Sequence, residues 1–120
     1  MLSEEASKLR QMPSVETLRE AVQQVIESNK RDGYVPTRFI QITEEGNAAG
    51  LLGICEGLIS SGETLEWLES ALRRYPTALT LEDFVARLGA SWGMSDETVE
   101  AAKARVAYFD RLVGSPRYEL

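Results

Sequence analysis

The chain has 120 residues, of which 13 are basic and 19 acidic, so its formal net charge is −6. This acidic balance disfavours binding to nucleic-acid phosphates and to anionic membranes. The lack of histidine excludes histidine-assisted catalysis and removes the commonest metal ligand, and a single cysteine excludes an internal disulfide.

The first thirteen residues form a polar segment, which we expect to be a frayed helix ending before Pro13. Its acids and its lack of an apolar run match neither a secretory signal nor a transit peptide, so we expect a cytoplasmic protein. No stretch of the chain reaches the roughly 18 consecutive apolar residues of a membrane span. A single helical domain is expected over residues 14–114, followed by a C-terminal tail over 115–120.

Apolar residues at helical spacing predict two helices in the first part of the domain, over residues 15–31 and 36–45. Ser14 is expected to cap the first helix, and Gly33 lies at its stop. Gly46 is expected to end the second helix in the left-handed conformation.

A polar row is expected on one face of the second helix, at spacings of four, three and four: Tyr34, Arg38, Gln41 and Glu45. Tyrosine and arginine are enriched at interaction hot spots, so this row is a candidate binding surface for a protein or a peptide. The alternative is an ordinary solvated helix face, on which Arg38 pairs with Glu45 or with water.

Four glycines in the next stretch also recur at spacings of four, three and four: Gly46, Gly50, Gly53 and Gly57. A triphosphate-binding loop requires a lysine after its glycines, and no basic residue lies between Arg38 and Arg73. A helix is therefore expected here, with Cys55 as a buried apolar residue. Because glycine inside a helix costs about 1 kcal/mol relative to alanine, the row predicts a face against which another helix packs closely.

Two further helices follow, the first over residues 64–75 and closed by Pro76. The second has a strong start signal, since Thr80 is followed three residues later by Asp83 in the spacing of a capping box. Gly89 is expected to end this helix after two turns.

The last helix is expected to begin after Ser95, its cap, and to end at Gly114. With it the chain contains about five or six short helices and no alternating strand pattern. The sequence therefore predicts an all-α class and a compact single domain.

The last two helices suggest a helix-turn-helix motif, which would place three basic side chains of the last helix near a nucleic-acid backbone: Lys103, Arg105 and Arg111. The connection between Gly89 and Ser95 is longer than the turn of that motif. Acidic residues at the start of the last helix would also face the phosphates. Nucleic-acid binding is therefore the alternative function and not the leading one.

Acidic residues cluster near the predicted helix starts, where carboxylates interact favourably with the helix dipole. None of the clusters has the spacing of a calcium-binding loop. We therefore expect no metal, no cofactor and no catalytic residue.

The segment around the polar row resembles a family of small uncharacterised bacterial all-helical proteins that carry the motif Gly-Tyr-x-x-Thr-Arg-Phe-x-Gln. The matching residues are Gly33, Tyr34, Thr37, Arg38, Phe39 and Gln41. Similar features continue over about residues 15–113, among them Leu51-Leu52, Leu79-Thr80-Leu81-Glu82, Asp96-Glu97, Ala102 and Arg105. The chain departs from the family after Gly46, where the family has more basic residues.

The resemblance implies a compact helical domain of bacterial genomes and mobile elements, sometimes found near defence genes, with no established activity. Together with the composition it leads us to expect a non-enzymatic protein–protein interaction domain. The expected partner is another protein or a second copy of the chain, meeting it through the polar row or the glycine row.

Overall fold

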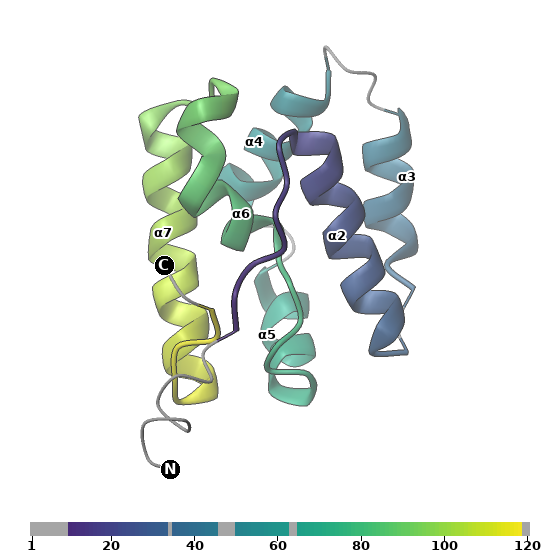
Figure 1. The fold of residues 1–120 in the computed structure, drawn as a ribbon, viewed down its shortest axis with the longest axis vertical. Helices are drawn as coiled ribbons and strands as arrows, with labels where there is room; N and C mark the ends of the chain where they lie inside the picture. The colour runs from purple at the N-terminus through teal and green to yellow at the C-terminus, as the bar shows by residue number, and fades with distance from the viewer. Residues whose placement is uncertain (1–9, 34, 46–49, 63–64, 119–120) are drawn as a thin grey trace.

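The computed structural model describes residues 10–33, 35–45, 50–62 and 65–118, and for Arg38 and Glu45 it describes the backbone alone. These residues form six α-helices and one 3-10 helix and no strand, which confirms the predicted all-α class (Figure 1). In chain order the helices are α2 (Leu18–Arg31), α3 (Thr37–Glu45), α4 (Leu51–Ser61), α5 (Leu65–Arg74), α6 (Leu81–Leu88), η1 (Gly89–Trp92) and α7 (Asp96–Val113). The Cα radius of gyration of 14.1 Å matches the roughly 13–14 Å of a compact chain of this length.

Helix α6 lies in the middle of the bundle, packed against α7 on one side and α2 on the other (Figure 1). Helix α4 contacts α2, α3 and α7, and α5 packs against α7. The first five residues of α6, 81–85, are all buried, and two of them are the acids Glu82 and Asp83. The start of α6 is therefore the place where the fold must satisfy two buried carboxylates.

The largest apolar cluster joins α2, α4, α6 and α7, and its buried members are Leu18, Val22, Ile26, Leu51, Cys55, Ile59, Leu81, Val85, Met94, Val99 and Ala102. Cys55 has no exposed surface, which confirms the prediction of a buried apolar residue. Burial raises the pKa of its thiol to about 12. The thiol is therefore protonated and poorly nucleophilic at neutral pH.

Several helix ends lie where local signals predict them. Thr80 Oγ1 accepts a hydrogen bond from the backbone N–H of Asp83, and the Asp83 carboxylate accepts one from the backbone N–H of Thr80, which completes the capping box. Ser95 caps α7, and Gly114 ends it with a φ of +88°. Helices α3 and α5 begin and end within one residue of their predicted limits.

The start of α2 differs from the prediction. The helix begins at Leu18 with Thr17 as its cap, whereas we expected Ser14 in that role. Residues 11–15 have no regular secondary structure, and Val15 packs against the buried cluster that contains Tyr118. This contact with a distant part of the chain keeps the segment out of the helix, and the signal that decides the start is Thr17 with Glu20 three residues later.

Helix α6 ends at Leu88 with Gly89 as its C-cap, as predicted, but Gly89 does not reverse the chain. Its backbone is right-handed helical, the chain tightens into η1, and the left-handed stop comes at Gly93 with a φ of +87°. A Cβ at Gly89 would lie 2.9 Å from Val85 Cγ1 and 3.0 Å from Val99 Cγ2. Gly89 is therefore required by close packing between this segment and α7.

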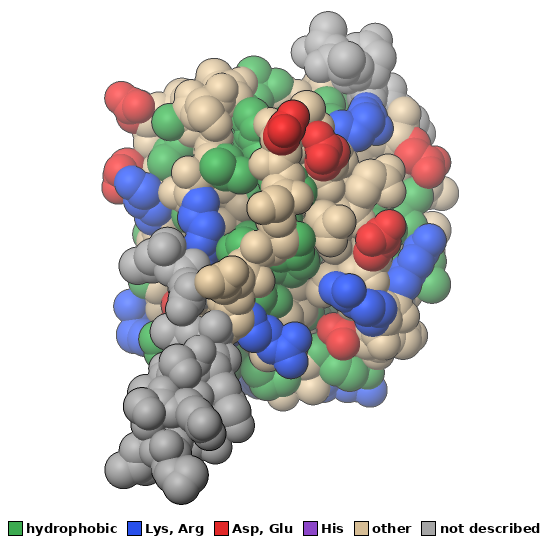
Figure 2. All heavy atoms as spheres, in the orientation of Figure 1, with side chains coloured by type: hydrophobic (Ala, Val, Ile, Leu, Met, Phe, Trp, Pro, Cys, Tyr) green, Lys and Arg blue, Asp and Glu red, His purple; other side chains and the backbone are tan. Residues whose placement is uncertain are grey.

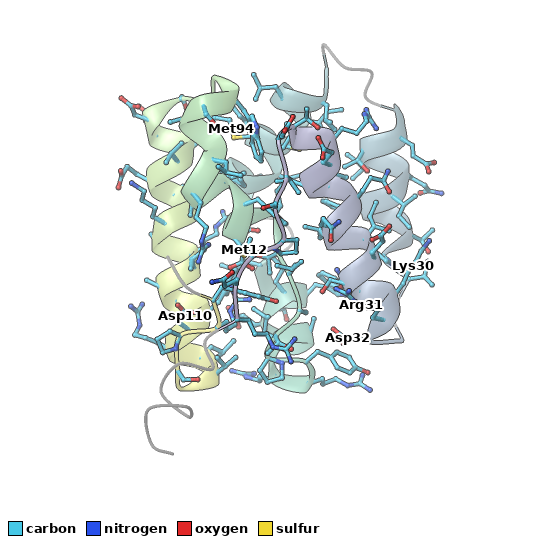
Figure 3. The ribbon with its side chains drawn as sticks, in the orientation of Figure 1. Met12, Lys30, Arg31, Asp32, Met94 and Asp110 are labelled. Carbon is cyan, nitrogen blue, oxygen red and sulfur yellow. The ribbon has the colours of Figure 1, made fainter. Side chains whose placement is uncertain are left out.

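The end of the chain returns to the core. Arg117 is 4% exposed and Tyr118 8%, so the predicted tail over 115–120 is wrong at these two positions. Tyr118 forms an isolated parallel bridge with Arg10, two residues before Met12, which is labelled in Figure 3. Residues 10–13 are not helical, and the rest of the predicted frayed helix over 1–13 lies outside the described residues.

The Arg117 guanidinium is enclosed by acceptors and aromatic rings. Its nitrogens lie 2.5 Å from Asp83 Oδ1, 3.2 Å from Asp110 Oδ1 and 2.9 Å from the Ala78 carbonyl oxygen. Asp110 is labelled near the lower end of α7 in Figure 3. The guanidinium carbon lies 5.7 Å from the ring centroids of Phe109 and Tyr118. These contacts bind the end of the chain to the start of α6.

A carboxylate of α4 caps α7. Glu56 Oε2 accepts hydrogen bonds from the Ser95 backbone N–H at 2.9 Å and from the Thr98 hydroxyl at 3.0 Å. The bond from the Ser95 backbone, followed by the one from Thr98, holds the pKa of Glu56 below its usual value of 4.5. The ionised carboxylate therefore joins α4 to the positive end of the α7 dipole.

We expect Glu56→Gln to lower the free energy of unfolding by about 1 kcal/mol at pH 7. Because the folded-state pKa of Glu56 is lowered, its contribution is full above the unfolded pKa and is lost as the pH falls through the folded one. Urea denaturation of parent and variant should therefore show a difference that shrinks below about pH 4. Glu27→Gln, at an exposed position of α2, is the control; a Glu56→Gln difference independent of pH would contradict the role of the charge.

Candidate functional site

A cleft of about 300 Å³ lies between α2, α3, the end of α4, α5 and the start of α6. Its lining residues are Val25, Asn29, Pro36, Phe39, Ile42, Leu58, Ile59, Trp67, Leu68, Leu79, Thr80, Leu81 and Glu82. Ten of these thirteen side chains are apolar. The cleft therefore suits an apolar group, and its volume is at the lower end of the range of ligand pockets.

Helical spacing places these side chains on shared faces. Val25 and Asn29 are four residues apart on α2, and Phe39 and Ile42 are three apart on α3. Pro36 fixes the entry to α3, because its carbonyl accepts the first bond of that helix at 2.9 Å. The cleft is thus formed where the apolar faces of several short helices meet incompletely.

The polar groups in the lining already have partners within the chain. Asn29 Nδ2 donates to the Val25 carbonyl at 2.7 Å, and Thr80 belongs to the capping box. Glu82 Oε2 accepts a bond from Arg105 Nη1 at 3.1 Å. In the part of the chain that the structure describes, every buried side-chain nitrogen and oxygen has a hydrogen-bond partner. Among the described residues, each polar side chain of the lining therefore already makes a hydrogen bond within the chain.

Glu82 is the acid among the lining residues, and 3% of its surface is exposed. Burial raises the pKa of its carboxyl, and the hydrogen bonds from its own backbone N–H and from Arg105 oppose that shift. The hydrogen bond from Arg105 therefore stabilises the charged form of this carboxyl against the cost of burial. A cationic ligand at this carboxylate would have to compete with Arg105.

Trp67 lies at the rim of the cleft and is 37% exposed. Val35, just before the cleft residue Pro36, is 56% exposed. Among the described residues these two are the large apolar side chains with the most exposure. Exposed tryptophan beside an apolar cleft is typical of interaction surfaces.

The predicted polar row can be followed only in part. Gln41 is exposed on α3, Tyr34 lies outside the described residues, and so do the side chains of Arg38 and Glu45. The row therefore stays a prediction. Phe39 and Ile42 of the same helix line the cleft.

The glycine row does not bring helices together within this chain. Gly53 and Gly57 are exposed on α4, and a Cβ at either position would meet no heavy atom within 4 Å. Gly50 is also exposed, before the first turn of α4, and Gly46 lies outside the described residues. Among the described residues no helix packs closely on Gly53 or Gly57, because α4 buries its other side, through Leu51, Cys55 and Ile59. Contact of this face with a second copy of the chain stays a prediction.

The basic residues of α7 do not form a common surface for phosphates. Arg105 is held by Glu82, and its side chain is only 15% exposed, which disfavours its predicted contact with a nucleic acid. Lys103 is exposed and lies 3.5 Å from Glu100, and Arg111 is exposed. On the face drawn in Figure 2, basic and acidic side chains are interspersed.

Metal and membrane sites were also sought among the described residues. They contain no group of three or more cysteine, aspartate or glutamate residues arranged to hold a metal ion. None of the described helices has both the length and the apolar character needed to cross a bilayer.

No family model, curated protein or solved structure matches this chain. The resemblance to the bacterial helical family therefore stays a prediction.

Sequence reasoning missed the cleft. Phe39 and Ile42 lie at helical spacing, but the residues that complete the lining come from four other segments of the chain. The sequence contains one local signal of the cleft. Trp67 and Leu68 are adjacent in α5, so one of these two large apolar side chains must lie away from the centre of the apolar face of the helix.

We expect Gly53→Ala and Gly57→Ala each to raise the free energy of unfolding by up to about 1 kcal/mol, because alanine favours the helix and its Cβ meets no neighbour. Urea denaturation measures this change. Gly89→Ala is the matched control and should destabilise, because its Cβ would press on Val85 and Val99. Destabilisation by Gly53→Ala would show that this face packs against a backbone after all.

Proposed function

We propose that this chain is a non-enzymatic bacterial interaction domain that acts in the cytoplasm and receives an apolar side chain of a protein partner in the cleft. The observation that carries this proposal is the cleft itself, about 300 Å³ in volume and lined mainly by apolar side chains. A cleft of this size suits one or two large side chains better than a bulky cofactor.

The state of the polar groups supports binding more than chemistry. Catalysis uses polar groups that are directed at a substrate, whereas Asn29, Thr80 and Glu82 are bonded within the chain. The thiol of Cys55 is buried on α4 and has a pKa of about 12. The remaining recognition element at the cleft is apolar contact, with Trp67 at the rim as an anchor of the kind that interfaces favour.

A second copy of the chain is one possible protein partner. Size-exclusion chromatography with light scattering distinguishes the cases, since a monomer at high concentration excludes self-association. Nucleic-acid binding is the weaker alternative, because Arg105 is used inside the fold and the net charge is −6.

The test is a titration with N-acetyl-tryptophanamide, which presents an apolar side chain between two peptide groups, followed by amide chemical shifts in NMR. We expect saturable shifts at the cleft residues Leu58, Leu68 and Leu79, with a dissociation constant on the order of 1 mM. Trp67→Ala should weaken binding by about fivefold or more. Lys103→Ala, an exposed change on α7, is the matched control and should have no effect.

N-acetyl-lysinamide serves as the second probe, because a charged side chain should not enter an apolar cleft. Equal shifts with both probes, or shifts located away from the cleft, would contradict the proposal.

A further inference from the structure

The cleft has one wall that is not a helix. Residues 79 and 80 line the cleft just before α6 begins at Leu81, and with residues 77 and 78 they form the wall segment, which joins α5 to α6. Leu79 N–H donates to Ser28 Oγ of α2 at 2.9 Å. A hydrogen bond thus ties the wall segment to α2, another side of the cleft.

Arg117 and Tyr118, the C-terminal strap, hold the wall segment by its backbone carbonyls. Arg117 Nη1 donates to the Ala78 carbonyl at 2.9 Å, and the Tyr118 hydroxyl donates to the Thr77 carbonyl. The Tyr118 ring belongs to the same buried apolar cluster as Val25 and Leu79, which both line the cleft. The strap therefore supports the wall through polar and apolar contacts.

The Asp83 carboxylate connects the strap to the wall a second time. Its Oδ1 accepts the 2.5 Å bond from Arg117, while its Oδ2 accepts bonds from the backbone N–H and the hydroxyl of Thr80, at 2.9 and 3.0 Å. Because the Asp83 side chain is 1% exposed, withdrawal of Arg117 would leave a buried carboxylate without its cation. The position of Thr80 in the wall therefore depends on the strap.

The strap itself has little regular structure. Among the described residues its backbone makes one isolated bridge, to Arg10, and the last helix ends four residues before Arg117, at Val113. A segment outside the helices that is held mainly by side chains opens locally at a lower free energy than the whole fold.

We propose that the C-terminal strap controls the cleft, so that docking of Arg117 and Tyr118 sets the wall in the form that accepts an apolar group. This inference rests on the proposed function of the cleft. By reciprocity, an occupant that fits the supported wall also favours the docked strap. Any partner or modification that withdraws the strap therefore weakens binding in the cleft.

The mildest test is Tyr118→Phe, which removes the hydroxyl bonded to Thr77 and keeps the ring in its cluster. We expect hydrogen exchange at the Leu79 and Thr80 amides to become about fivefold faster, and the N-acetyl-tryptophanamide affinity to fall about threefold or more. Tyr108→Phe is the matched control, because it removes a tyrosine hydroxyl bonded to Glu69 and leaves the wall segment untouched. It should leave the exchange of the Leu79 and Thr80 amides and the affinity unchanged.

The two readouts separate the possible failures. If the parent protein does not bind the probe, the proposed function fails, while the exchange rates still show whether the strap holds the wall. If the parent binds the probe and Tyr118→Phe changes neither readout, the strap does not control the cleft. If Tyr118→Phe and Tyr108→Phe change both readouts equally, the changes reflect a general loss of stability, and the inference is overturned.

Discussion

The ion pair between Arg117 and Asp83 is the interaction on which the arrangement of the bundle most depends. Both side chains are almost fully buried, at 2% and 1% exposure. Removing two charges from water costs several kcal/mol for each ion unless the charges are well paired and hydrogen-bonded. Here Asp110, the Ala78 carbonyl and two aromatic rings complete the surroundings of the guanidinium. The last described residues of the chain therefore anchor the start of α6.

Pairing of a buried charge also holds Glu82 at the start of α6, where this residue lines the cleft. Glu82 and Asp83 are adjacent buried acids, and each is paired with an arginine that comes from a later part of the chain. In a protein with more acidic than basic residues, two arginines are thus used inside the fold. The surface that faces the cleft is mainly apolar, and it comes from α2, α3 and α5 together with the wall segment that the strap supports. Because the buried acids are paired within the fold and the cleft lining is mainly apolar, the cleft suits an apolar group. The strap that pairs with Asp83 also supports the wall of this cleft.

Local signals in the sequence predicted much of the fold and little of the site. Thr80 with Asp83, and Ser95, cap the helices they were assigned to, because capping depends on residues a few positions apart. Arg105 and Arg117 were read as a surface residue and part of a tail, because their partners lie 23 and 34 positions away. The glycines of α4 were placed on the correct helix, but spacing does not tell which side of a helix is covered. Gly89 ends α6 as predicted, but spacing did not indicate that it is also a site of close approach.

The most direct test of the role of the ion pair is a double-mutant cycle with Arg117→Met, Asp83→Asn and the combination, in which urea denaturation gives each free energy of unfolding. Each single variant should lose about 3 kcal/mol or more, since it leaves one buried group without its partner. The combination should lose clearly less than the sum, with a coupling free energy of about 1–3 kcal/mol. Additive losses, or single losses below about 0.5 kcal/mol, would mean that the pair does not fix the start of α6.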